Sequence, residues 1–79
     1  MRLVKQIPHS HFRMSIFQWN AKYILEIELD RFKQVYKWGE EEVESTVDIE
    51  KLLTPAFLNH TMGLFLEMRK GINEISQTK

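Results

Sequence analysis

Residues 11–38 read HFRMSIFQWNAKYILEIELDRFKQVYKW, and this stretch decides the fold that we expect for the chain. Apolar residues recur at alternate positions in three successive segments, which is the period of a β-strand with one buried face. Asn20-Ala21 and Asp30-Arg31 separate the segments. Asn tolerates the positive φ that a two-residue hairpin loop requires, although Ala is poorer than Gly at the second position. The stretch therefore predicts a three-stranded antiparallel meander that ends at Gly39.

Side-chain types support one register for these hairpins. Pairing Trp19 with Lys22 gathers apolar residues on one face of the sheet and places Arg13 opposite Glu28 on the other. A shift by one residue would mix the two sets. The polar Gln34 is the exception on the apolar face, which otherwise carries Phe12, Met14, Ile16, Tyr23, Leu25, Ile27, Leu29, Phe32, Tyr36 and Trp38.

The N-terminal segment, residues 3–7, has two interpretations. It can form an extra strand, with Pro8 marking its end at a sheet edge. It can also fold back over the second face of the sheet. The sequence leaves both open.

The second half of the chain is helical. The apolar period changes to about 3.6 residues after Gly39. Ser45 or Thr46 caps a short helix that runs through Leu53, and Thr54-Pro55 starts a long helix that extends to about residue 76. Its expected inward positions are Leu58, Thr61, Phe65, Met68, Ile72 and Ile75. The expected fold class is α+β: the meander is followed by a short helix and a long C-terminal helix packed on one sheet face.

Composition narrows the function classes. The 79 residues fit one domain, residues 1–79. Eleven basic and eleven acidic residues cancel, so no net charge attracts nucleic acid or anionic lipid. A core of this size is thin and no cysteine can staple it, so self-association is one way to bury more surface. No apolar run approaches the roughly 18 residues of a membrane span, and residues 1–7 lack a signal peptide's apolar block. We therefore expect a cytoplasmic protein without a membrane partner.

Two apolar groups fall outside the expected core. Phe17, Trp19, Ile24 and Val35 lie on the face of the sheet that is otherwise polar, and Leu66 points away from the inward stripe of the long helix. Exposed apolar clusters often mark an interface. The alternatives are cover by the N-terminal segment and a helix that is buried over a wide arc.

Signals for chemistry are weak. No nucleophile motif or phosphate-binding glycine loop occurs, so we expect no enzyme and no cofactor. His9 and His11 form an H-x-H pair whose rings would share one side of a strand, with Asp30 nearby as a third metal ligand. An ordinary surface pair is the simpler interpretation, and we expect no metal site.

Single-stranded nucleic-acid binding is an alternative function for the sheet. Phe17 and Trp19 would stack on bases beside Arg13, Lys33 and Lys37. The balanced charge argues against it, because phosphate neutralisation supplies much of the affinity for nucleic acid.

Two segments resemble a family of small uncharacterised bacterial proteins, a domain of unknown function. They are Ile7-Pro8-His9 with residues 16–23, IFQWNAKY, and residues 48–53, DIEKLL, with Phe57-Leu58. Those relatives favour Gly where this chain has Ala21, which agrees with a hairpin there. The resemblance implies structure and no activity. Our leading expectation is a small protein-interaction module, either a homodimer or an adaptor for another protein.

Overall fold

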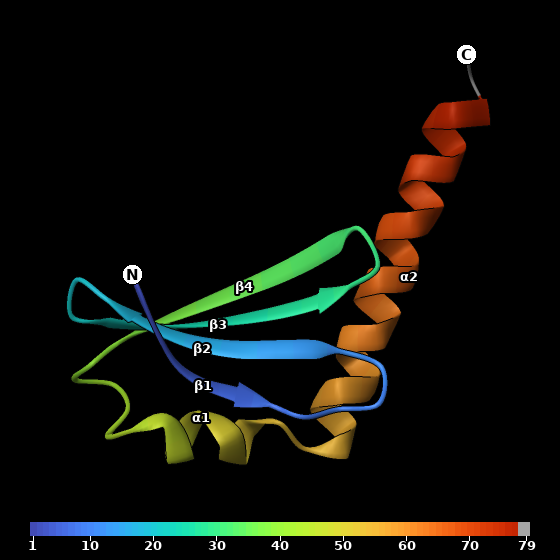
Figure 1. The fold of residues 1–79 in the computed structure, drawn as a ribbon. Coiled ribbons are helices and arrows are strands. Elements are labelled where there is room, and N and C mark those ends of the chain that lie inside the picture. The colour runs from blue at the N-terminus through green and yellow to red at the C-terminus, as the bar shows by residue number, and fades with distance from the viewer. Residues whose placement is uncertain (78–79) are drawn as a thin grey trace.

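The computed structural model describes residues 1–77 as a four-stranded antiparallel sheet followed by two helices (Figure 1). The sheet order follows the chain, β1-β2-β3-β4. The elements are β1 (Arg2–Ile7), β2 (Arg13–Trp19), β3 (Lys22–Leu29), β4 (Phe32–Gly39), α1 (Thr46–Leu52) and α2 (Pro55–Gln77). The α+β class is confirmed.

Both hairpins adopt the register that the sequence predicts. Trp19 pairs with Lys22 at the first turn, and Leu29 pairs with Phe32 at the second. Asn20 and Ala21 both have positive φ, 54° and 60°, as a two-residue hairpin loop of type I′ requires. The tight turns and the alternation of side chains therefore specify the same pairing.

The N-terminal segment forms the strand β1 beside β2. Leu3 pairs with Phe17 and Lys5 with Ile16, so one strand shifts relative to the other between Leu3 and Lys5. The segment thus extends the sheet at its edge. The fold-back interpretation is wrong, because the backbone of β1 is used to pair with β2.

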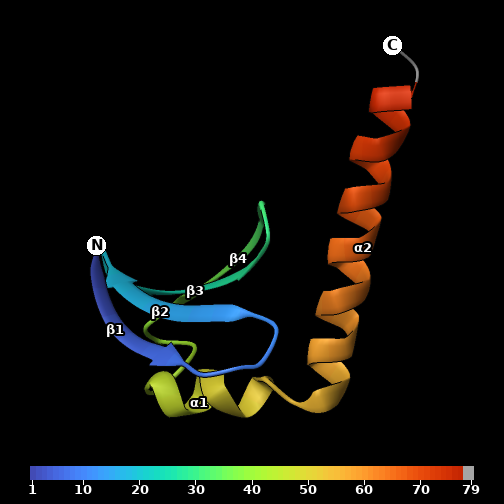
Figure 2. The same cartoon turned by 45° about the vertical axis from the view of Figure 1, so that its right-hand side comes forward.

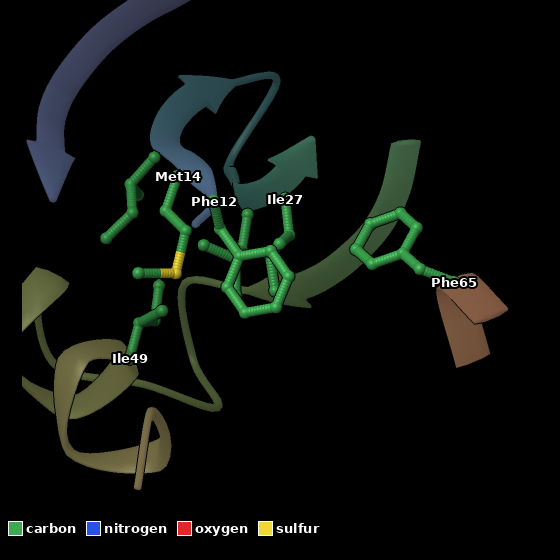
Figure 3. Packing of buried hydrophobic residues seen from close by; sticks show 7 residues of the cluster. Phe12, Met14, Ile27, Ile49 and Phe65 are labelled. Atoms are coloured by element: carbon green, nitrogen blue, oxygen red, sulfur yellow. The ribbon is translucent and has the colours of Figure 1, made fainter. Parts of the chain in front are cut away.

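The core lies on the apolar face of the sheet. Seven buried side chains form it (Figure 3). Three come from β2 and the loop before it, two come from β3, and each helix contributes one. They are Phe12, Met14, Ile16, Leu25, Ile27, Ile49 and Phe65.

The helix α1 is held against the sheet by one apolar and one ionic contact. Ile49 is fully buried, and the Nζ of Lys5 on β1 lies 2.8 Å from a carboxylate oxygen of Glu50. Ser45 is the N-cap and accepts a hydrogen bond from the backbone N–H of Val47. The cap that the sequence predicts is therefore confirmed.

The helix α2 begins where Thr54-Pro55 predicts. The Thr54 hydroxyl accepts a hydrogen bond from the N–H of Phe57, at 3.2 Å. Farther along, Thr61 and Phe65 are buried as expected. The rings of Phe65 and Phe12 lie 5.8 Å apart, so the first half of α2 reaches the core.

The second half of α2 departs from the expectation. Ile72 and Ile75 were expected to face inward, yet they are 44% and 59% exposed. The helix continues past the β3–β4 turn (Figures 1 and 2), and Ile72 lines a hollow with Arg31 and Phe32 at that turn. The ion pair between Arg69 and Asp30, at 3.5 Å, joins α2 to that turn. The radius of gyration is accordingly 14.4 Å, against about 12 Å for a compact domain of this length.

Candidate interaction surfaces

The first surface is the outer face of β2 and β3, the face opposite the core. Phe17 lies between Leu3 on β1 and Ile24 on β3. Leu3 is 49% exposed and Trp19 is 52% exposed, whereas Phe17 is half-buried. An exposed apolar strip therefore joins β1 and β2 at the Asn20 end of the sheet.

Ile24 corrects the sequence-based assignment of this surface. It was expected to be available to a partner, but only 2% of it is exposed. The residue is in the central strand β3, between Phe17 and Lys37, in a strongly curved sheet (Figure 2). It is not a member of the main core cluster. It therefore lies beside the strip without forming its exposed surface.

Val35 and Leu66 are exposed, but neither belongs to the outer-face strip. Val35 is 46% exposed on β4 and pairs with Glu26, so a carboxylate lies beside it. Leu66 is 54% exposed on α2. The adjacent Phe65 is buried, and one residue corresponds to about 100° of helix rotation. The five predicted interaction residues therefore do not form one continuous surface.

The second surface is the apolar side of α2 over residues 69–75, the C-terminal part of the helix that runs past the β3–β4 turn; we call this part the projecting half of α2. Ile72 and Ile75 follow Phe65 and Met68 at spacings of three and four residues, so all four lie on one stripe of the helix. Sequence periodicity found the stripe but assigned all of it to the core. The signal that it is partly exposed is its length, because α2 has 23 residues and the strands have eight at most.

The third surface is a groove of about 540 Å³ between β4 and α2, which the sequence did not indicate. Three consecutive residues of β4 line one side, and Leu64, Glu67 and Met68 of α2 line the other. Side chains of consecutive strand residues alternate between faces. A groove lined by Gln34, Val35 and Tyr36 must therefore run along the outer edge of the strand.

Lys33 on the outer face is paired with two carboxylates of β3. The Lys33 ammonium lies 3.2 Å from Glu26 and 3.4 Å from Glu28. The hydrogen bond that Lys33 donates to Glu26, the charge of Glu26 and then Glu28 raise the pKa of Lys33 above its usual 10.5. This cation therefore has two anionic partners on the same face.

The histidines do not have the geometry expected of a metal site. His9 and His11 lie in the loop between β1 and β2, not in a strand, and the β2–β3 ladder ends at Arg13. The Nδ1 of His9 accepts hydrogen bonds from the N–H groups of His11 and Phe12, at 3.1 and 3.3 Å. Among residues 1–77, no group of three or more His, Cys, Asp or Glu side chains could hold a metal ion. His9 instead shapes the loop that leads Phe12 into the core.

No helix in the described part of the chain is long and apolar enough to cross a membrane. Comparison with protein-family models found none that matches the chain, and searches of curated proteins and of solved structures also returned no match. The resemblance to small bacterial proteins stays a prediction.

Proposed function

We propose that this chain is a small non-enzymatic protein-interaction module that self-associates through the projecting half of α2. The observation that carries the proposal is the apolar stripe of α2, which continues without a break past the end of the sheet. Phe65 on this stripe is 2% exposed, whereas Ile75 on the same stripe is 59% exposed. A second chain would cover what the protein's own sheet leaves open.

The energetic case rests on the isoleucines. Full burial of one such side chain contributes about 1.5–3 kcal/mol. Ile72 and Ile75 are roughly half exposed, so each still has on the order of 1 kcal/mol to gain from cover. The gain is offset by the entropy of association, which makes a weak to moderate complex the expected outcome.

Gly71 adds a second argument. A Cβ at this position would meet no atom within 4 Å, so packing within the described residues does not require glycine. Glycine inside a helix costs about 1 kcal/mol relative to alanine. A closely packed second helix is one physical reason for a residue without a side chain beside Ile72.

Charge permits pairing of two copies. Eleven basic and eleven acidic residues leave no net charge to repel a second copy. The projecting half of α2 is itself mixed, with Arg69 and Lys70 near Glu74.

Analytical ultracentrifugation tests the proposal. A series from about 1 μM to about 1 mM spans the affinities of moderate and weak complexes. We expect a reversible monomer–dimer equilibrium that Ile72→Gln with Ile75→Gln shifts to monomer. The matched control is Val47→Gln with Leu52→Gln, which changes two exposed apolar residues of α1 and should leave the equilibrium unchanged. A wild-type chain that stays monomeric throughout, or a dimer insensitive to the α2 pair, contradicts the proposal.

A further inference from the structure

We infer that the free edge of β4 accepts an extended, acidic segment of another protein as a fifth strand, seated beside the groove against α2. This inference deepens the proposed interaction role, but it uses a different surface from the projecting half of α2. It therefore can fail while self-association stands, and the reverse also holds.

The backbone geometry identifies which groups are available. In an antiparallel ladder, every second residue exchanges hydrogen bonds with its partner strand, and the intervening residues point theirs to the other side. The two-residue loop closes on the pair Leu29 and Phe32, which makes that pair a hydrogen-bonded one. The hydrogen bond from the N–H of Glu40 to the carbonyl of Ala21, at 3.1 Å, continues the same alternation at the far end.

It follows that Lys33, Val35 and Lys37 direct their N–H and C=O groups away from β3. β4 is an outer strand of the sheet, so no neighbouring strand within residues 1–77 pairs with these groups. An extended segment can form a ladder with all three residues.

The two edge strands of the sheet differ in how well they can pair with an added strand. The edge strand β1 has six residues and an irregular register between Leu3 and Lys5. A bulge of this kind twists an edge and protects it from pairing. β4 has eight residues, all paired with β3 in one uninterrupted register. β4 is therefore the straighter template.

The groove supplies side-chain specificity on one face of the added strand. Residues of that strand that point to the α2 side would lie over Tyr36, Leu64 and Met68, which favour apolar side chains. Glu67 also lines the groove and disfavours a carboxylate there. Acidic side chains of the segment therefore belong on its other face.

That other face meets cationic side chains. β4 carries Lys33 and Lys37 and no acidic residue. Lys33 is paired with Glu26 and Glu28, whereas Lys37 is exposed and has no carboxylate within salt-bridge distance among the described residues. A second copy of β4 is a poor occupant, because β4 has no acidic residue and therefore brings no carboxylate to Lys37. An acidic, alternating segment from a different protein complements this edge.

The probe is a fluorescein-labelled synthetic peptide of alternating valine and glutamate, and its control replaces every glutamate by lysine. Fluorescence anisotropy with the full chain should give at least about tenfold tighter binding of the glutamate peptide, a difference of about 1.4 kcal/mol. The amides of Lys33, Val35 and Lys37 should become protected from hydrogen exchange only when that peptide is bound.

Two variants locate the site. Val35→Pro removes an outward N–H at an edge, where proline is tolerated, and should lower affinity at least tenfold. Its matched control is Gln6→Pro on the edge strand β1, which should bind as the wild type does. Lys37→Glu keeps every backbone donor and should reverse the preference between the two peptides. Circular dichroism establishes that each variant folds.

The inference is overturned if the glutamate peptide does not bind, if Lys37→Glu leaves the preference unchanged, or if Val35→Pro abolishes a dimer of the free chain instead. The last result would identify a second copy as the occupant. Sedimentation of the Ile72 and Ile75 variant in the same buffers separates these outcomes from a failure of self-association through α2.

Discussion

The side-chain amide of Gln34 donates a hydrogen bond to the backbone carbonyl of Thr61, at 3.1 Å, and so connects β4 directly to α2. The Tyr36 hydroxyl in turn donates to the amide oxygen of Gln34, at 3.0 Å. The polar residue that interrupts the apolar face of β4 therefore gives the half-buried Tyr36 hydroxyl an acceptor and donates its own amide to α2.

Replacing Gln34 by leucine should lower the free energy of unfolding by about 1–3 kcal/mol, because the Tyr36 hydroxyl would be left half-buried without this acceptor. Urea denaturation measures the change. Gln6→Leu on the exposed strand β1 is the control and should stay within about 0.5 kcal/mol of the wild type. Equal effects at both positions would show that the Gln34 bond does not stabilise the fold.

Ala21→Gly should stabilise the protein. Ala21 has φ of 60°, a conformation that costs an L-residue roughly 1–2 kcal/mol and glycine almost nothing. Part of the gain is lost to the greater entropy of glycine in the unfolded chain, so we expect a net increase of about 0.5–1 kcal/mol in thermal or urea unfolding. The same change in the first turn of α2, Ala56→Gly, should have the opposite sign. A destabilising Ala21→Gly would contradict the turn geometry.

Ile49→Ala should lower the free energy of unfolding by about 2–5 kcal/mol, since the side chain is fully buried and its loss leaves a cavity between α1 and the sheet. Val47, two residues earlier on the same helix, is 52% exposed. Val47→Ala should therefore change stability by less than about 0.5 kcal/mol. Comparable losses for the two variants would mean that α1 presents a different face to the sheet.

Lys33 should titrate above 10.5 in the folded protein, because Glu26 and, to a smaller extent, Glu28 stabilise its ammonium form and raise its pKa. The folded pKa exceeds the unfolded one, so this contribution to stability is fully present below about pH 10.5 and is lost as pH rises through the folded pKa. NMR titration of the Lys33 side chain measures its pKa in the folded protein. Glu26→Gln should return the pKa toward 10.5, and Glu28→Gln should do so less. A Lys33 titration unaffected by Glu26→Gln would rule out this ion pair in solution.

Local chemistry made the two hairpins predictable. Each depends on a two-residue turn and on neighbouring segments whose apolar positions match in one register only, as at Trp19 and Lys22. The strand formed by β1 could not be chosen over the fold-back alternative, because the sequence does not show that the outer edge of β2 needs a partner. The groove beside Val35 escaped detection for a related reason: its two walls come from segments about thirty residues apart.

The sequence by itself determined the period of each segment, the turns between the strands, and the caps at Ser45 and Thr54, because all of these depend on residues that are close in the chain. Only the tertiary structure decided which apolar residues are covered. Ile24 and Ile72 illustrate this in opposite directions. Ile24 is buried on the face expected to be exposed, and Ile72 is exposed on the stripe expected to be buried. Burial depends on where other elements of the fold begin and end in space. The pattern of residues along one helix or strand does not specify the positions of those other elements.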